Sequence, residues 1–398
     1  AGTCLVTVTK NADVNYLSAT TGAVTVTFNK AVQSTLSVTP VSGTFGTALT
    51  LRPSGGSGAG AVTFSATNGT ATGCTLSGNL LTSTSAGTCL VTASKASDTN
   101  YLSASSSVTT VTLGAANQAA LVVSNASGTY GTGLTLSTSG GSGSGAVSYV
   151  VTNGTATGCA ISASVLSATS AGTCLVTATK AADSNYNAAS SVLKTVTFAK
   201  ASQSALTVTS TSATYGDSLQ LAYSGGSGTG AVTFTIAASG TASGCSINSG
   251  VLTALSAGTC IVKVSVAGDA NYLVATSANT TVTFAQAAQS ALVITSTSGT
   301  FGSALALTTS GGSGTGTVTF TVANGTATGC AIASGKLSAT STGTCFVTAT
   351  KAANANYLAY TAAATAVTIA ASSQAALTVT SVTATYNTPL TLSTSGGS

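Results

Sequence analysis

One short segment returns along this chain at intervals of 85 or 86 residues, and this repeat constrains the fold more than any other feature. The segment reads AGTCLVT in three copies, AGTCIVK in the copy at Cys260 and TGTCFVT in the last, and it contains Cys4, Cys89, Cys174, Cys260 and Cys345. A glutamine recurs with the same spacing in QSTL, QAAL or QSAL: Gln33, Gln118, Gln203, Gln289 and Gln374. Self-similarity at a fixed period is typical of tandem copies of one structural unit. The chain is therefore expected to be an array of like domains of about 85 residues each.

The markers divide the chain into whole and partial repeats. The whole repeats are 32–116, 117–201, 202–287 and 288–372. Residues 1–31 form the C-terminal part of a truncated repeat, and 373–398 the N-terminal part of another. Neither fragment contains the segment equivalent to 143–170, so we expect the array to continue in both directions in the natural protein. The extra residue of 202–287 lies between Gln203 and Cys245, where we expect an insertion in a turn.

Each repeat is expected to be an antiparallel β-sandwich. Apolar and polar residues alternate over short runs rich in Thr and Val, turn residues separate the runs, and no helical period extends beyond one turn. For repeat 117–201 the expected strands are 120–125, 134–139, 146–153, 159–163, 165–169, 173–180 and 190–200. Asn-Gly at Asn153 predicts a hairpin turn after the third strand, and this interpretation is preferred to the N-glycosylation site that Asn-Gly-Thr also fits.

Composition removes most functional classes. The chain has ten Lys or Arg, five Asp, and no Glu, His, Met or Trp. Without an imidazole base or a glutamic acid, catalysis is not expected, and no cofactor is expected either. The net charge of +5 is spread thinly, so nucleic acid is not an expected partner. Ser, Thr or Gly interrupts every apolar run before it reaches the ~18 residues of a transmembrane segment.

A glycine-rich stretch resembles a phosphate-binding loop at first sight. It reads SGGSGTGAVTF at Ser224 and recurs in similar form at Ser54, Ser139 and Ser310. A phosphate loop requires a following helix and usually a lysine, whereas this stretch continues directly into an expected strand. We therefore expect a flexible connection between strands.

The cysteines occur in pairs 15 residues apart, and the pairs are Cys74 with Cys89, Cys159 with Cys174, Cys245 with Cys260, and Cys330 with Cys345. A hairpin between the two cysteines could bring the sulfurs together, and closing such a loop stabilises a small domain by about 3 kcal/mol. Zinc is the alternative, but it needs four ligands and each repeat offers two cysteines and no His. Disulfides are therefore expected, which indicates an extracellular protein. Cys4 has no partner within its fragment.

Two blocks resemble the bacterial immunoglobulin-like repeats of large secreted and cell-surface proteins. They are GTCLVTATKAADSNY, from Gly172 to Tyr186, and YGTGLTLSTSGGSG, from Tyr130 to Gly143. The resemblance implies tandem immunoglobulin-like antiparallel β-sandwiches in an extended array. It also implies a stalk, adhesin or fibre rather than an enzyme.

The loop before the last strand carries Asp-x-Asn-Tyr, or Asn-x-Asn-Tyr in the last whole repeat. Calcium is one interpretation, but each loop offers at most one carboxylate, so an Asx turn is preferred. An isopeptide bond from the lysine before this loop is disfavoured because the chain has no Glu. We expect the loop tyrosine and the glycine-rich loop to face the preceding repeat and to make a stiff joint. The junction tyrosines are Tyr16, Tyr101, Tyr186, Tyr272 and Tyr357.

These features favour a structural segment of a long extracellular fibre or stalk, secreted or attached to the cell surface. So few charges protect so many strands that copies of the chain are expected to associate, laterally or end to end. The alternative is a cell-surface adhesin whose repeats or distal tip bind glycans, the cell envelope or a host or neighbour-cell protein. A polar, aromatic-bearing loop that varied among the repeats would favour the adhesin, but the expected loops are nearly the same in each repeat and poor in aromatic residues, which favours the fibre.

Overall fold

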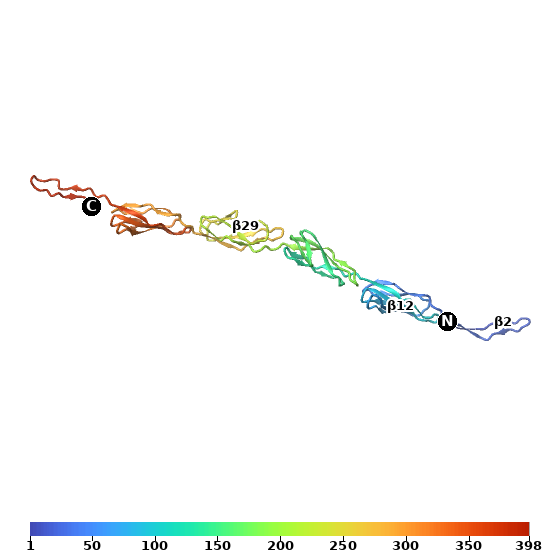
Figure 1. The fold of residues 1–398 in the computed structure, drawn as a ribbon. Coiled ribbons are helices and arrows are strands. Elements are labelled where there is room, and N and C mark those ends of the chain that lie inside the picture. Colours follow the sequence, from blue (N-terminus) through green and yellow to red (C-terminus); the bar gives the residue numbers. More distant parts are fainter. Residues whose placement is uncertain (398) are drawn as a thin grey trace. The chain divides into compact units, whose positions relative to one another are not determined.

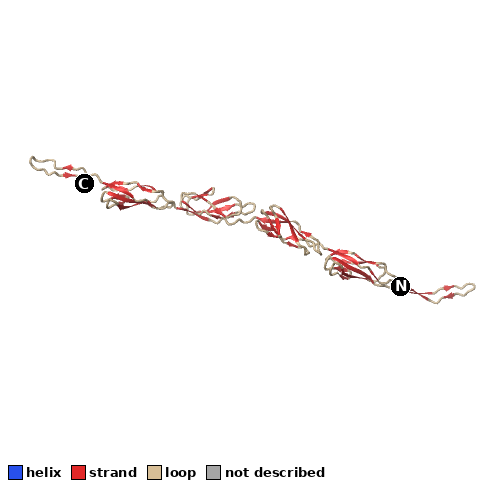
Figure 2. Ribbon diagram, viewed as in Figure 1, coloured by secondary structure: helices blue, strands red, loops and turns tan. Residues whose placement is uncertain are grey.

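The computed structural model describes residues 1–397, and the fold of this part is all-β (Figure 1). Short strands joined by loops make up every repeat, and Figure 2 shows no helix among the described residues. Consistently, residues 1–397 contain no helix that is long and apolar enough to cross a membrane. The chain forms two compact units, Ala1–Ala201 and a second that begins at Ser202. Their boundary lies between repeats 117–201 and 202–287.

The strands of the first unit are short. In residues 1–31 they are β1 (Gly2–Val6), β2 (Thr9–Lys10), β3 (Ala19–Thr20) and β4 (Val24–Phe28). In 32–116 they are β5 (Leu36–Thr39), β6 (Ser42–Thr44), β7 (Leu49–Thr50), β8 (Arg52–Gly55), β9 (Val62–Asn68), β10 (Thr75–Ser77), β11 (Leu80–Thr82), β12 (Gly87–Lys95), β13 (Ala104–Ser105) and β14 (Thr109–Gly114). In 117–201 they are β15 (Val122–Val123), β16 (Ser127–Thr129), β17 (Leu134–Thr135), β18 (Thr138–Ser139), β19 (Val147–Asn153), β20 (Ala160–Ser162), β21 (Val165–Ser167), β22 (Gly172–Lys180), β23 (Ala189–Ser190) and β24 (Lys194–Ala199).

The second unit repeats this order. In 202–287 the strands are β25 (Thr207–Val208), β26 (Ser212–Thr214), β27 (Leu219–Gln220), β28 (Tyr223–Ser224), β29 (Val232–Ala238), β30 (Ser246–Asn248), β31 (Val251–Thr253), β32 (Gly258–Val266), β33 (Ala275–Thr276) and β34 (Thr280–Ala285). In 288–372 they are β35 (Leu292–Ile294), β36 (Ser298–Thr300), β37 (Leu305–Ala306), β38 (Thr309–Gly311), β39 (Val318–Asn324), β40 (Ala331–Ala333), β41 (Lys336–Ser338), β42 (Gly343–Lys351), β43 (Tyr360–Thr361) and β44 (Thr365–Ala370). Residues 373–397 contribute β45 (Thr378–Val379) and β46 (Thr394–Ser395).

Each whole repeat is an immunoglobulin-like sandwich, as expected. In 32–116 the long strand β12 pairs with β9 on one side and with β14 and β13 on the other, and β6 pairs with β14. The facing layer has the order β10-β11-β7, and β5 pairs with β8. The other three whole repeats have the same pairings between their equivalent strands.

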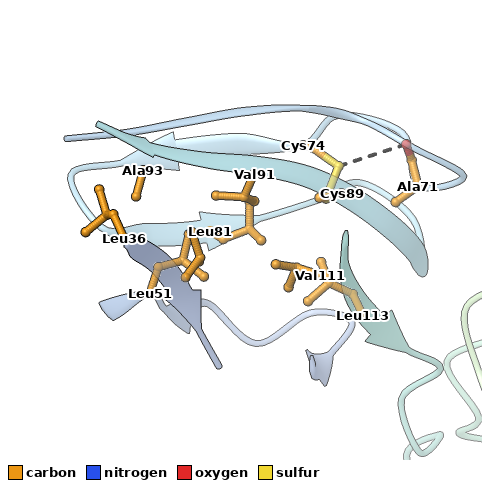
Figure 3. Packing of buried hydrophobic residues seen from close by; sticks show 11 residues of the cluster. Leu36, Leu51, Ala71, Cys74, Leu81, Cys89, Val91, Ala93, Val111 and Leu113 are labelled. Atoms are coloured by element: carbon orange, nitrogen blue, oxygen red, sulfur yellow. Dashed lines mark hydrogen bonds between the residues drawn. A yellow bond between two sulfur atoms is a disulfide. The ribbon is translucent and has the colours of Figure 1, made fainter. Parts of the chain in front are cut away.

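The core of repeat 32–116 lies between these layers (Figure 3), and each of the other whole repeats has an equivalent cluster of buried residues. Along β12 every second side chain points inward, so that Cys89, Val91 and Ala93 are fully buried. Leu51 and Leu81 of the facing layer are also fully buried. Burying one such leucine stabilises the fold by about 2 kcal/mol, so these aliphatic layers contribute much of the stability of the repeat.

The strand pairing differs from the expectation at several points. The sandwich is not purely antiparallel, because β16 pairs in parallel with β24. The expected strand 134–139 divides into β17 and β18, which pair in different sheets, and 190–200 divides into β23 and β24. In the first case the chain passes from one sheet to another, whereas β23 and β24 both pair with β22 and only a short break separates them. Neither change has a signature in the alternation of apolar residues.

The hairpin expected at Asn153-Gly154 is wrong. Strand β19 before it pairs with β22, whereas β20 after it pairs with β21. The side chain of Asn153 explains its presence, since its Oδ1 accepts a hydrogen bond from the backbone N–H of Cys159 at 2.9 Å. The asparagine therefore shapes a connection between sheets.

The extra residue of repeat 202–287 is not in a turn. It lies in β29, whose register with β32 shifts between Ile236 and Ala238. This irregularity is a β-bulge, a form in which a strand accepts one extra residue without losing its partner.

Candidate functional site

Eight cysteines form four disulfides, each within one repeat. The bonds are Cys74–Cys89, Cys159–Cys174, Cys245–Cys260 and Cys330–Cys345, with Cα–Cα distances of 5.9 to 6.0 Å. In 32–116 the bond links Cys74, at the start of edge strand β10, to Cys89 of β12 in the other sheet, at one end of the core (Figure 3). A bonded sulfur has no thiolate to offer a metal, so the zinc alternative is wrong. Cys4 is free and exposed.

The Asp-x-Asn-Tyr loop is an Asx turn that also holds the glycine-rich loop. In 117–201, Asp183 Oδ1 accepts hydrogen bonds from the backbone N–H groups of Asn185 at 2.9 Å and Tyr186 at 2.8 Å. Its Oδ2 accepts from the backbone N–H of Ser144 at 2.6 Å and from the Ser144 hydroxyl at 3.1 Å. One carboxylate thus joins two loops that are about 40 residues apart in the chain.

Hydrogen bonds of this kind lower the pKa of Asp98, Asp183 and Asp269 below the usual range of an aspartate. For Asp183 the main cause is the backbone N–H of Ser144, followed by that of Asn185, because both donate to the ionised form. The pKa of Asp98 is lowered chiefly by the N–H of Asn100, and that of Asp269 chiefly by the N–H of Thr229.

The last whole repeat has an amide in place of this carboxylate. Asn354 Oδ1 accepts from the N–H groups of Asn356 and Tyr357, both at 2.9 Å, which preserves the Asx turn. Its Nδ2 donates to the hydroxyl of Thr315 at 3.1 Å. In this repeat a neutral side chain therefore joins the Asn-x-Asn-Tyr loop to the glycine-rich loop.

The carboxylate oxygens of these loops are engaged in hydrogen bonds. The aspartate oxygens already accept backbone N–H groups, and residues 1–397 contain no cluster of three or more His, Cys, Asp or Glu side chains that could hold a metal.

The glutamine that recurs in every repeat also joins the Asp-x-Asn-Tyr loop to the glycine-rich loop. Gln118 Nε2 donates to the carbonyl oxygens of Asn187 at 2.9 Å and Ala181 at 3.2 Å. Its Oε1 accepts from the backbone N–H of Gly143 at 3.2 Å. This explains why the glutamine accompanies the loops in every repeat.

The glycine-rich loop is packed, which corrects the expectation of a flexible connection. A Cβ atom on Gly145 would lie 2.0 Å from the carbonyl oxygen of Ala181, and one on Gly140 would lie 1.9 Å from that of Ala120. Gly140 also has a φ of +78°, in the left-handed region. The glycines allow two backbones to touch.

Within the first unit, the Asp-x-Asn-Tyr loop of repeat 117–201 contacts the preceding repeat. The Tyr186 ring meets the Phe45 ring edge-on, with centroids 5.7 Å apart. Asn185 Oδ1 accepts a hydrogen bond from the backbone N–H of Ala86 at 2.8 Å. The connecting residue Ala116 donates to the Asn185 carbonyl at 2.9 Å and accepts from the N–H of Asn187 at 2.8 Å. The junction is thus a set of directional contacts.

The second unit contains an equivalent junction between its two whole repeats. The rings of Tyr215 and Tyr357 are also edge-on, with centroids 5.5 Å apart. Asn356 Oδ1 accepts from the backbone N–H of Ala257 at 3.0 Å, and Asn356 is again 99 residues after its donor. Ala287 takes the place of Ala116, since it forms a parallel bridge with Tyr357.

The remaining junction tyrosines lie in equivalent loops. Tyr101 forms a parallel β-bridge with Ala31. The side-chain oxygen of the neighbouring Asn100 accepts a hydrogen bond from the backbone nitrogen of Ala1. The N–H of Tyr272 donates to Asp269 Oδ1 at 2.8 Å. Tyr16 is 74% exposed, and residues 1–31 contain no preceding repeat for it to contact.

The sequence pattern predicted the loop tyrosine as a junction residue, but it did not predict the residues that act with it across the junction. The asparagine before it binds across the junction, and an aromatic residue of the preceding repeat packs on it. Both recur in the sequence with the period of the repeat. The asparagine is part of the Asp-x-Asn-Tyr motif, and an aromatic residue recurs before Gly or Asn at Phe45, Tyr130, Tyr215, Phe301 and Tyr386.

No protein-family model and no curated protein sequence matches the chain. Among solved structures, invasin, described as a bacterial integrin-binding protein, matches 83% of this chain and 79% of its own, with 14% identity and a TM-score of 0.32. The S-layer protein SbsC matches 87% of this chain and 56% of its own, with 15% identity and a TM-score of 0.24. The human desmocollin-1 ectodomain matches 82% and 78%, with 10% identity and a TM-score of 0.22. Likenesses this remote carry no argument about function.

Proposed function

We propose that this chain is a non-enzymatic structural segment of a long extracellular fibre or stalk, and that copies of it associate into filaments. The observation that carries the proposal is the repeated junction. In each unit an asparagine accepts a backbone hydrogen bond from the preceding repeat, 99 residues earlier, beside an edge-on pair of aromatic rings. Directional contacts of this kind restrict bending between domains, which is what a stalk requires.

The extracellular location rests on the disulfides. Each whole repeat has one, and bonds of this kind persist in oxidising compartments and are rare in the cytosol. They also suit a structural role, because a small sandwich that buries a modest core gains about 3 kcal/mol from one such bond.

Self-association is supported by the edges of the larger sheets. Among the described strands, β9, β19, β29 and β39 each pair with one neighbour only, so one side of each strand has unpaired backbone groups. In β29 a β-bulge interrupts this edge, and a bulge is one of the devices that protect an edge, so β9, β19 and β39 are the regular ones. None of the three contains a charged residue or a proline, which are the usual protection of an exposed edge. Their outward side chains are mainly Ser, Thr and Val, and Val150 is 67% exposed.

The experiment is electron microscopy of the recombinant, unglycosylated chain with its disulfides formed. We expect thin, stiff particles at low concentration and laterally associated filaments at high concentration. Isolated particles at every concentration would contradict the filament, and particles that bend freely between adjacent repeats would contradict the stalk.

A further inference from the structure

The sandwich of repeat 202–287 has an uncovered stretch on one side. The short hairpin β30–β31 reaches only β27, and β28 pairs with β25 alone among the described strands. At the start of β29, opposite this gap, Val232 remains 41% exposed. A groove of about 660 Å³ lies here, between β27, β28, the start of β29 and the turn that joins β30 to β31.

Two aromatic rings form the wall of this groove. Tyr223 of β28 meets Phe234 of β29 edge-on, with ring centroids 6.1 Å apart, and Tyr223 is 38% exposed. The contact holds the tyrosine ring in place and leaves part of its surface open to solvent. The positions equivalent to Tyr223 in the other whole repeats are occupied by Pro53, Thr138 and Thr309, so this wall distinguishes one repeat from the others.

Neutral polar groups line the rim. Gln220 Nε2 donates to the carbonyl oxygen of Gly250 at 3.2 Å, which fixes the amide beside the groove. Ser249 and Thr233 add hydroxyl groups, and none of the lining residues is charged. The positions equivalent to Gln220 are Thr50, Thr135 and Ala306, so the amide is also specific to this repeat.

We propose that this groove binds a neutral saccharide. An exposed aromatic ring offers a flat apolar face to the C–H side of a sugar ring, and the amide and hydroxyls can bond to sugar hydroxyl groups. The volume lies within the usual range of small-ligand sites. An extended peptide is a poorer fit, because β28 is only two residues long and offers few backbone groups for strand addition. The uncharged lining gives an acidic sugar no counter-charge.

The site gives repeat 202–287 an adhesive function in addition to the structural one. It does not depend on filament formation, since every element of the groove belongs to one repeat.

The test is binding of the 398-residue chain to surfaces that carry cellobiose, lactose or N,N′-diacetylchitobiose, with sialyllactose as the acidic comparison. We expect saturable binding to at least one neutral disaccharide. Y223T inserts the residue found in two other repeats, and it should weaken binding at least about fivefold through the lost ring face. Y223F should retain binding, and Q220T should reduce it.

The matched control is Y386T, which removes a tyrosine that is 93% exposed and far from the groove in sequence. It should leave binding unchanged. The proposal is overturned if none of the three neutral sugars binds, if Y223T binds as tightly as the wild type, or if sialyllactose is preferred. Thermal unfolding of Y223T checks that the repeat is still folded.

Discussion

The side-chain oxygen of Asn185 lies 2.8 Å from the backbone nitrogen of Ala86, which belongs to the preceding repeat. The asparagine is itself held by an Asx turn, since its N–H donates to Asp183. A loop that is fixed within its own domain therefore presents an acceptor to the preceding domain, and the two repeats are joined by a preorganised contact.

Removing this acceptor should loosen the junction without unfolding either repeat. In N185A the Ala86 amide loses its partner, and a typical hydrogen bond is worth about 1 kcal/mol, so its hydrogen exchange should accelerate about fivefold. Y186S should do the same by removing the contact with Phe45 and should also increase flexibility in small-angle scattering. The matched control is S184A, because Ser184 is exposed and alanine occupies its position as Ala270 and Ala355. Unchanged exchange at Ala86 in both variants would contradict this role.

Acid should break the contact between the Asp-x-Asn-Tyr loop and the glycine-rich loop in repeat 117–201. The equivalent contact in repeat 288–372 should be unaffected. The pKa of Asp183 is lowered in the folded state, so its contribution to stability is present above the unfolded pKa of about 4 and is lost as pH falls through the folded value. Asn354 does not titrate. The amide resonances of Ser144 and Tyr186 should shift with a midpoint below about 4, whereas those of Asn356 and Tyr357 should not follow it.

The variant D183N provides the control for this titration. It should abolish the shift and keep the turn, as Asn354 does naturally. The account would be contradicted if the amide resonances shifted with a midpoint at or above the ordinary pKa of an aspartate, or if those of the Asn354 loop shifted equally. In either case the Asp183 carboxylate would not be the group whose protonation separates the two loops.

The disulfide should limit how far each repeat extends under force. Cys159 and Cys174 are 15 residues apart, so the residues between them cannot extend under force while the disulfide is intact. Reduction should add roughly 50 Å to the extension of each unfolding event, at about 3.4 Å per residue. Single-molecule stretching with and without reductant measures the difference, and mass mapping of non-reduced digests checks the pairing. Equal increments in both conditions would contradict the assignment.

Alanine should not be tolerated in the glycine-rich loop. In G145A the new Cβ would lie 2.0 Å from a backbone oxygen, so we expect a loss of about 1–3 kcal/mol in the stability of that repeat. G114A is the control, because its Cβ would have its nearest neighbour at 3.8 Å. Thermal unfolding of both variants distinguishes a packed loop from a flexible one, which would accept either substitution equally.

Much of this fold could be predicted because local alternation and fixed spacing determine it. Val176 and Ala178 point inward from β22 as a period of two requires, and Cys159 and Cys174 flank a hairpin that brings them together. The parallel pairing of β16 with β24 could not be predicted in this way, because it depends on where the chain crosses between layers. The partners of Tyr186 were missed for a similar reason: Phe45 and Ala86 are distant in sequence and meet the tyrosine loop only once two domains are placed end to end.

Sedimentation velocity over a concentration series tests the central claim of self-association most directly. The wild-type chain is compared with a triple variant, S65K, V150K and T321K, which places one charge on the outward face of each of β9, β19 and β39. We expect the wild type to form species that grow with concentration and the variant to remain monomeric, because charged side chains on an exposed edge oppose pairing. A wild-type chain that stays monomeric at the highest concentration would contradict the account.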